Sequence, residues 1–168
     1  MAQVVADTSA LVSLGIAADL DVDPLAVALG KYTILVPSVV VDELQEVASY
    51  DDDHGRAASR VLDRMEAFPT RPVELDAEFP LDDGENAAVT LANAEDADLL
   101  LCDEFNRLGL IHASLVDTRL VTTPTLLSVY VRNGWVSSGD AQTVLDAISA
   151  ARSWDTNCYV QRAKSLLE

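Results

Sequence analysis

The sequence contains little positive charge, few cysteines and no long apolar run. Among its 168 residues, 11 Lys and Arg stand against 28 Asp and Glu, which gives a net charge of −17. Lysine occurs only at positions 31 and 164. Because Lys and Arg normally supply the contacts to phosphate groups, binding of any polyanion by this chain would depend on a few particular residues.

Two further absences narrow the class of protein. No run of about 18 apolar residues occurs, which excludes a helix that crosses a membrane. The N-terminus lacks a basic segment and continues into the apolar block 4–6, so we interpret it as a strand, not a signal peptide, and expect a cytoplasmic protein. Cys102 and Cys158 are the only cysteines, and their spacing fits neither a disulfide framework nor a zinc site. We expect both to serve in packing.

The acidic residues are spread over the whole chain. Asp and Glu occur in nearly every expected loop and helix and are not collected in one tail. Such a coat is typical of a protein from a salt-rich, halophilic cytoplasm, where high net charge maintains solubility. At 1 M salt the Debye length is about 3 Å, so repulsion within the coat is screened there and we expect poor stability without salt. Most of the carboxylates therefore serve solvation.

Apolar blocks alternate with amphipathic stretches, without repeats, low-complexity tracts or long linkers. We therefore expect one domain over residues 1–168. Strands are expected at 4–6, 33–36, 73–75, 98–102 and 120–121, and helices from about 9, from about 24, and at about 38–49, 55–67, 84–94, 104–111, 124–132, 138–150 and 156–167. Strands that are apolar on both faces and alternate with helices predict an α/β fold, a three-layer α/β/α sandwich with a mainly parallel central sheet.

Two acidic residues directly follow expected strands. Asp7 comes after the block 4–6, and Asp103 comes after the block 99–102. In parallel sheets ligands bind beyond the carboxyl ends of the strands, so we expect both side chains to point into one cleft. Taken singly, each Asp could instead cap the helix that follows it.

Two glutamates are distinguished from the acidic coat by their helical phase. Glu43 falls beside the apolar face of the helix expected at 38–49, whereas Asp42 and Glu46 fall towards solvent. Glu85 belongs to a stripe of small apolar residues that repeats at i, i+3, i+4 and i+7. The alternative for Glu85 is that it complements the positive end of its helix.

Four carboxylates aimed at one point would repel each other and resist ionisation. A bound divalent cation removes this conflict. Oxygen ligands without His or Cys suit Mg²⁺ or Mn²⁺ and not zinc. The sequence therefore predicts a magnesium or manganese site whose ligands are Asp7, Glu43, Glu85 and Asp103.

In these segments the chain resembles the PIN-domain family of ribonucleases, a fold found in many toxins of toxin–antitoxin pairs. The matching segments follow the family's order: 4–12 with its D-T-S element, 36–44 with the family's glutamate, 81–92 with a D-x-G-E variant, 99–104, 122–127 and 133–136. Each motif alone has low specificity, and the ordered set is fairly specific. The helices expected at about 138–168 are unmatched.

The resemblance assigns the role of catalytic metal ligand to the same four carboxylates. It also implies supporting hydroxyl groups at Ser9 and at Thr122 or Thr123. Glu104 stands where relatives often carry a second Asp, so Asp103 and Glu104 could share or exchange the ligand role.

The activity that the resemblance implies is hydrolysis of RNA phosphodiester bonds, with one or two Mg²⁺ or Mn²⁺ ions activating a water and stabilising developing charge. A toxin role, a homodimer and an antitoxin partner are implied in the same way. One alternative is a catalytically silent PIN-like module for RNA processing or protein interaction. Another is an α/β phosphatase or receiver domain. This fits less well, because Ser9 occupies the place of a required second Asp and no lysine lies at a suitable strand end.

Basic residues form one stripe, with Arg56, Arg60 and Arg64 at i, i+4 and i+8 of an expected helix. Because arginine is scarce in this chain, the stripe could contact RNA or a protein partner. The alternative is a helix face held by ion pairs with nearby acids. We interpret His54 and His112 as surface or packing residues, since neither lies at a strand end.

Overall fold

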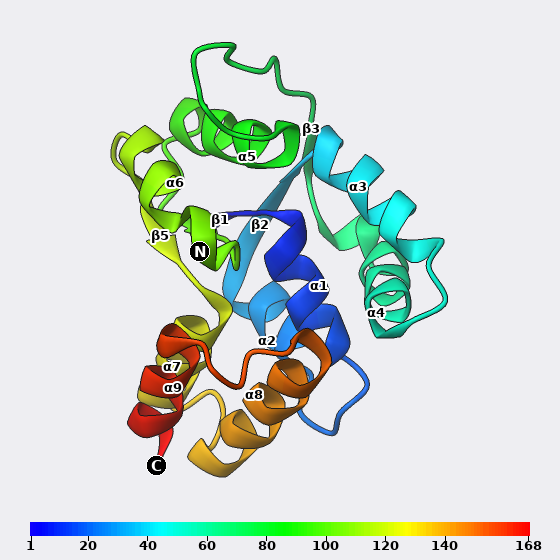
Figure 1. Ribbon diagram of the computed structural model, residues 1–168, viewed down its shortest axis with the longest axis vertical. Helices are drawn as coiled ribbons and strands as arrows, with labels where there is room; N and C mark the ends of the chain where they lie inside the picture. The colour runs from blue at the N-terminus through cyan, green and yellow to red at the C-terminus, as the bar shows by residue number, and fades with distance from the viewer.

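The computed structural model describes residues 1–168 and is built around a five-stranded parallel sheet (Figure 1). The strand order is β3-β2-β1-β4-β5, so the N-terminal strand occupies the centre. All four neighbouring pairs are parallel. The strands are β1 (Ala2–Ala6), β2 (Tyr32–Pro37), β3 (Thr70–Arg71), β4 (Leu99–Leu101) and β5 (Arg119–Val121).

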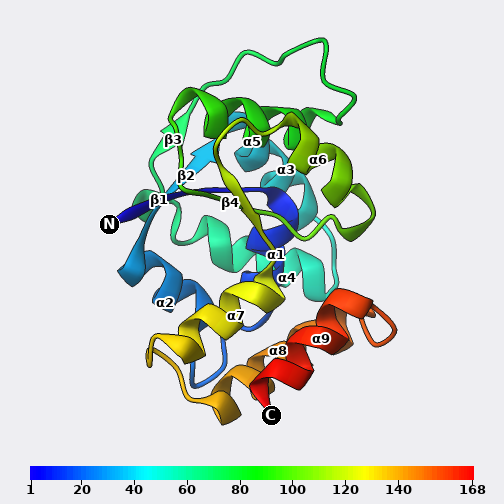
Figure 2. The same cartoon turned by 90° about the vertical axis from the view of Figure 1, so that its left-hand side faces the viewer.

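Helices cover both faces of the sheet. α5 and α6 lie on one side, and α7, α8 and α9 gather on the opposite side, as the two views agree (Figures 1 and 2). The helices are α1 (Thr8–Ile16), α2 (Pro24–Lys31), α3 (Ser38–Ala48), α4 (Asp53–Leu62), α5 (Asp83–Ala94), α6 (Leu108–Ser114), α7 (Thr123–Arg132), α8 (Ser138–Arg152) and α9 (Cys158–Leu167). The predicted three-layer α/β/α sandwich is confirmed, with a sheet that is parallel throughout.

Successive residues of the strands enter two separate apolar clusters. Val4 and Ala6 of β1 belong to the larger cluster, on the side of α1, α7 and α8, whereas Val5 belongs to the smaller cluster under α5 and α6. β4 behaves in the same way, with Leu101 in the larger cluster and Leu100 in the smaller one. Alternate side chains of a strand point to opposite faces, so a sheet buried on both sides requires the continuous apolar runs seen in the sequence.

Several predicted elements differ from the structure. The strand expected at 73–75 was wrong: the edge strand is β3, two residues long, and residues 73–75 have no regular structure. Pro72 follows β3 directly and has no N–H with which to continue a ladder. The helix expected at 55–67 ends at Leu62 and is followed by a 3₁₀ turn at Met65–Ala67. The helix expected from 104 begins at Leu108, after a 3₁₀ turn at Phe105–Arg107.

The cysteines differ from each other in burial. Cys102 is buried in the smaller cluster, as expected, but the packing role expected for Cys158 was wrong because its side chain is exposed at the start of α9. None of the helices has the length and apolar character needed to cross a membrane.

Candidate active site at the carboxyl ends of the strands

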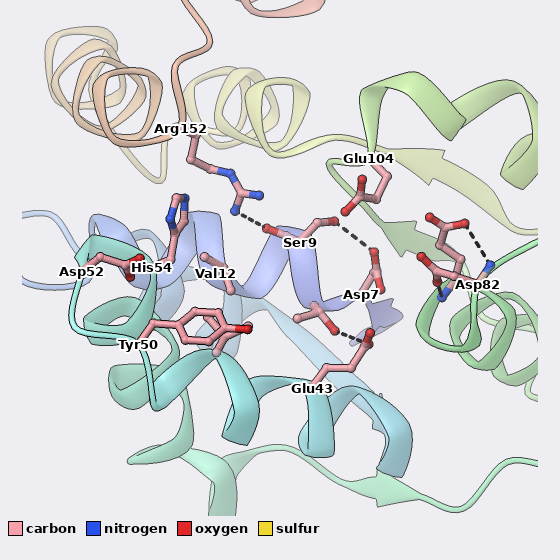
Figure 3. A pocket seen from close by; sticks show the side chains of 13 residues that line it. Asp7, Ser9, Val12, Glu43, Tyr50, Asp52, His54, Asp82, Glu104 and Arg152 are labelled. Carbon is pink, nitrogen blue, oxygen red and sulfur yellow. Dashed lines mark hydrogen bonds between the residues drawn. The ribbon is translucent and has the colours of Figure 1, made fainter.

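A cavity of about 390 Å³ opens beside the carboxyl ends of the central strands (Figure 3). Its walls come from the start of α1, from α3 and the loop after it, from the start of α5, from the turn after β4 and from the end of α8. Thirteen residues line it: Asp7, Thr8, Ser9, Val12, Glu43, Val47, Tyr50, Asp52, His54, Asp82, Glu85, Glu104 and Arg152.

The pocket has two chemically different ends. Figure 3 shows Asp7, Glu43, Asp82 and Glu104 on one side and Tyr50, Asp52, His54 and Arg152 on the other, with Val12 and Ser9 between them. We name the first group, together with Glu85, the acid end. We name the second group the arginine end.

Asp7 reaches the pocket from the carboxyl end of β1. It occupies the N-cap position of α1 but makes no capping hydrogen bond, so helix capping does not account for its side chain. The residue is 4% exposed, and its carboxylate accepts a hydrogen bond from the Ser9 hydroxyl at 3.0 Å and contacts the Cys102 thiol at 3.4 Å. Burial raises the pKa of Asp7 to about 7, although both of these contacts act to lower it.

Asp103 lies behind the pocket wall and does not line the cavity. Its backbone N–H donates to the Ser9 hydroxyl oxygen at 2.9 Å, so Ser9 links the two aspartates that end β1 and β4. Its Oδ1 accepts from the Thr123 N–H at 2.7 Å, while its buried Oδ2 has no hydrogen-bond partner. Burial raises the pKa of Asp103. Such an orphaned carboxylate oxygen is costly without a cation or a donor.

Glu104, the neighbour of Asp103, does line the pocket. The two residues point differently because the chain leaves β4 at this point and turns into the 3₁₀ segment. Burial raises the pKa of Glu104, and the charge of Arg152 opposes this shift. The structure therefore places one of the two alternative ligands at the cavity surface and the other beneath it.

Glu43 enters the pocket from α3. It is half-buried, whereas Asp42 and Glu46 are exposed, as their helical phase predicts. The Thr8 hydroxyl donates to its Oε1 at 2.7 Å. A Cβ atom at Gly84 would overlap the Glu43 carboxylate, so a larger residue at the start of α5 would push this side chain out of its present position. Burial raises the pKa of Glu43.

Glu85 is the third residue of α5 and forms a capping box with Asp82. The Glu85 N–H donates to Asp82 Oδ1 at 2.8 Å, and the Asp82 N–H donates back to Glu85 Oε1 at 3.4 Å. The same Oε1 pairs with the Arg107 guanidinium at 3.1 Å. Burial and the nearby Asp82 charge raise the pKa of Glu85, and Arg107 opposes this shift. Glu85 therefore caps its helix, as the alternative interpretation expected, and it also lines the pocket.

The predicted hydroxyl groups differ in their positions. Ser9 lies between Asp7 and Asp103, as described above. Thr123 reaches Asp103 through its backbone N–H. Thr122 instead caps α7, where its hydroxyl accepts from the Thr125 N–H at 3.4 Å, and it does not line the pocket.

Arg152 is the last residue of α8 and lies at the arginine end. It donates one hydrogen bond, to the backbone carbonyl of Ser9 at 2.9 Å, and its guanidinium lies 5.7 Å from the centre of the Trp154 ring. Burial lowers the pKa of Arg152, and the charges of the nearby acids act in the opposite direction. Sequence reasoning missed Arg152, because only the packing of α8 against α1 brings it to the pocket.

The arginine stripe lies outside the pocket and is paired within the chain. Arg56 pairs with Asp53, Arg60 with Asp19, and Arg64 with Asp23. Arg60 also donates to the carbonyl of Gly15 at the end of α1, at 3.0 Å. Ion pairs thus hold all three arginines, but the expected single helix face is not formed, because α4 ends at Leu62, before Arg64, and only Arg56 pairs within the helix.

Sequence reasoning missed further residues of the pocket. Thr8, Tyr50, Asp82 and His54 line it, and Arg107 pairs with Glu85. His112 is exposed, as expected, but the surface or packing role expected for His54 was incomplete, because its side chain contributes to the cavity wall. Tyr50 and His54 belong to the loop after α3 and the start of α4, whose path no periodic pattern could predict.

The donors of the acid end are all oxygens, which suits a hard divalent cation. No three His, Cys, Asp or Glu side chains come close enough together to share one ion. The carboxylates are instead held by groups of the chain: Ser9 bonds Asp7, Thr8 bonds Glu43, and Arg107 bonds Glu85. The chemistry of the donors and the unpartnered Oδ2 of Asp103 fit a cation, and binding would require some of these bonds to be exchanged.

The chain matches a known protein family over nearly its whole length. The family model DUF3368, described as a PIN domain, matches residues 3–168, which include α8, α9 and Arg152. Comparison with the curated proteins finds no match. One similar solved structure is the crystal structure of VapBC2 from Rickettsia felis bound to a DNA fragment from their promoter. It has a TM-score of 0.49 and 15% sequence identity, over 71% of this chain and 98% of that chain.

Proposed function

The chain belongs to the PIN-domain family, and from that membership we propose that it is a metal-dependent endoribonuclease. PIN domains are typically nucleases that use divalent metal ions. RNA is the proposed substrate, the phosphodiester bond is the bond hydrolysed, and Mg²⁺ or Mn²⁺ is the proposed ion.

The observation that carries the proposal is the convergence of carboxylates from separate chain segments on one cavity. Asp7, Glu43, Glu85 and Glu104 come from four different elements or turns, and all line the acid end. Burial raises the pKa of each of these groups. A divalent cation would favour their ionised forms and offset the desolvation.

We assign the metal to Asp7 and to Asp103 or Glu104, with Glu85 completing the site and Glu43 holding a bound water or a second ion. When bound, the metal supplies Lewis-acid activation of a water and stabilises charge on the phosphate. The surrounding residues orient these ligands. Ser9 fixes Asp7 and the backbone of Asp103, Thr8 fixes Glu43, and Arg107 holds Glu85.

The wider biological role is also part of the proposal. By family resemblance the chain acts as the toxin of a toxin–antitoxin pair, works as a homodimer and is inhibited by an antitoxin protein. We propose that residues 1–168 form one PIN unit and that the acidic coat suits a salt-rich cytoplasm. The competing function is a catalytically silent PIN-like module.

The test is cleavage of pooled cellular RNA in molar KCl with Mg²⁺ or Mn²⁺, compared with the same reaction in EDTA. Asp7→Asn is expected to lower the rate by about a thousandfold or more, because it removes a charged ligand of the ion. Asp42→Asn, an exposed change of the same charge, is the matched control and should retain activity. A folded wild-type protein that leaves RNA intact with either ion would favour the silent module.

A further inference from the structure

We propose that the arginine end of the pocket is a nucleotide-binding subsite. In this subsite Arg152 binds the phosphate next to the scissile bond, and Tyr50 with His54 contacts the base of the same nucleotide. This assignment rests on the proposed ribonuclease function, because it adds a substrate-binding site to the same pocket.

The lining of the pocket is strongly acidic and contains one cationic side chain. Six of the residues that line it are Asp or Glu, and Arg152 is the only Lys or Arg among them. An RNA backbone that approaches the acid end therefore meets carboxylates on several sides. A fixed guanidinium inside the cavity lowers this electrostatic barrier and specifies where a phosphate can lie.

The guanidinium of Arg152 is available for a ligand. It carries five N–H donors, and only one hydrogen bond, to the Ser9 carbonyl, occupies them. It makes no ion pair within the chain. Four other arginines are already neutralised by ion pairs within the chain. Arg56, Arg60 and Arg64 each pair with an aspartate, and Arg107 pairs with Glu85.

The bond to Ser9 also sets the position of Arg152 relative to the acids. Ser9 accepts from Arg152 through its backbone carbonyl and donates to Asp7 through its hydroxyl. One residue therefore connects the guanidinium to the proposed metal ligand, and Figure 3 shows Arg152 and Asp7 on either side of it. A phosphate on Arg152 would lie beside the acid end and not at a remote surface.

The loop after α3 supplies the other wall of this end. Tyr50 is 50% exposed and makes no side-chain hydrogen bond, and His54 likewise has none. The loop is held closely against α4, because a Cβ atom at Gly55 would overlap the Tyr50 carbonyl and because Asp52 accepts from the Gly55 N–H at 2.8 Å. The backbone is thus fixed while the ring of Tyr50 remains accessible to a base. Aromatic rings stack on all bases, so such a wall tolerates different sequences.

The pocket has the dimensions of a ligand site. Its volume of about 390 Å³ lies within the range of roughly 300–1,000 Å³ that is usual for small-molecule sites. Val12 and Val47 add an apolar surface to its lining. A nucleotide has the matching composition, with a charged phosphate for Arg152 and a flat apolar face for the side of the pocket that carries Tyr50.

Binding of a short fluorescent oligoadenylate, followed by anisotropy with Mg²⁺ in the Asp7→Asn background, tests the subsite without cleavage. We expect Arg152→Gln to weaken binding by about tenfold or more. It should also reduce the slope of log affinity against log salt by about 0.7, the value for one phosphate contact on a single strand. Arg152→Lys should bind with intermediate affinity, because it retains the charge and loses the fork.

The base contact is tested by Tyr50→Ala, which should weaken binding by about fivefold or more, whereas Tyr50→Phe should not, because stacking needs the ring and not the hydroxyl. Arg162→Gln is the matched control, since Arg162 is exposed on α9 and does not line the pocket. Thermal unfolding checks that each variant is folded. If Arg152→Gln does not fold, Arg152→Lys and the two Tyr50 variants decide the outcome.

The subsite is overturned if Arg152→Gln and Tyr50→Ala bind the oligoadenylate as tightly as Arg162→Gln does. The proposed function fails in a different way. If wild-type protein does not cleave RNA but the variants lose binding as expected, the pocket is an RNA-binding site without nuclease activity, and the subsite stands.

Discussion

The two ends of the pocket differ in how firmly their side chains are held. At the acid end nearly every carboxylate is fixed by a donor from the chain: Asp7 by Ser9, Glu43 by Thr8, and Glu85 by Arg107. At the arginine end the side chains of Tyr50 and His54 make no hydrogen bonds, and Arg152 makes one. Both ends are formed at the same edge of the fold, yet the side chains of the acid end are held by more hydrogen bonds than those of the arginine end.

This difference separates two requirements of a nuclease. Ligands that hold an ion in a fixed geometry need support from surrounding groups, and loss of that support typically costs activity. A surface that accepts a flexible polymer needs free donors and accessible rings instead. We infer that the acid end serves the reaction and the arginine end serves the substrate, and the following variants test that division.

After Asp7→Asn, the largest expected effect is that of a second carboxylate of the acid end. Glu43→Gln is expected to lower kcat by about 10–100-fold with little change in KM, because it removes one charge from the metal site while the arginine end is intact. Gly84→Ala should have a similar effect, because the added methyl group would displace the Glu43 carboxylate. Asp42→Asn serves as the exposed control on the same helix. A change in KM alone would contradict the division between the two ends.

A smaller effect is expected on the stability of the metal-free protein. Asp7 has a pKa of about 7 in the fold against 3.8 ordinarily, so the folded chain binds a proton that the unfolded chain has lost. This contribution to stability is complete below about pH 4 and is lost as the pH rises through about 7. In EDTA at pH 8, Asp7→Asn should therefore be more stable than wild type by about 1–3 kcal/mol. This is less than the full pKa difference implies, because the site can rearrange around the charged carboxylate.

Denaturant unfolding in molar salt, where the acidic coat is screened, measures this difference. The stabilities of wild type and Asp7→Asn should converge at pH 4 and separate towards pH 8. Addition of Mn²⁺ should then stabilise the wild type more than the variant, because only the complete site binds the ion tightly. If the unfolding free energies of wild type and Asp7→Asn instead ran parallel over the whole pH range, Asp7 would have an ordinary pKa. There would then be no desolvation cost at Asp7 for the metal to offset.

The smallest effect is expected for the arginine stripe. Arg56→Gln should change unfolding free energy by less than about 1 kcal/mol, because Arg56 and Asp53 form an exposed pair. RNA affinity should change by less than about twofold, since the charge lies outside the pocket and is already balanced. If the triple replacement of Arg56, Arg60 and Arg64 abolished RNA binding while Arg152 remained, the phosphate contact would belong to the arginine stripe.

The parts of the fold and site that the sequence predicts are those set by local periodicity. Apolar runs located β1, β2 and β4, and the residue after β1 lines the pocket. Helical phase separated Glu43 from Asp42 and Glu46. In each case the relevant information lies within one or two turns of the residue concerned.

The features that could not be predicted depend on how distant segments meet. The turn after β4 decides that Glu104, and not Asp103, faces the cavity. The periodicity of apolar residues in the sequence cannot tell which of two adjacent residues at a strand end does so. Arg152 reaches Ser9 across 143 positions of sequence, and Arg107 reaches Glu85 across 22. The edge strand β3 is too short to give a pattern, so it was expected at 73–75 in error.

The strand order has a consequence for the cell that makes the protein. The ribosome makes β1 before β4 and α8, so the acid end forms only after β4 has paired with β1, and the arginine end only after α8 has packed. A growing chain that carries β1 but not yet β4 therefore lacks Glu104, and it lacks Arg152 until α8 has been made. A pocket assembled in this order is complete only after both segments have joined β1.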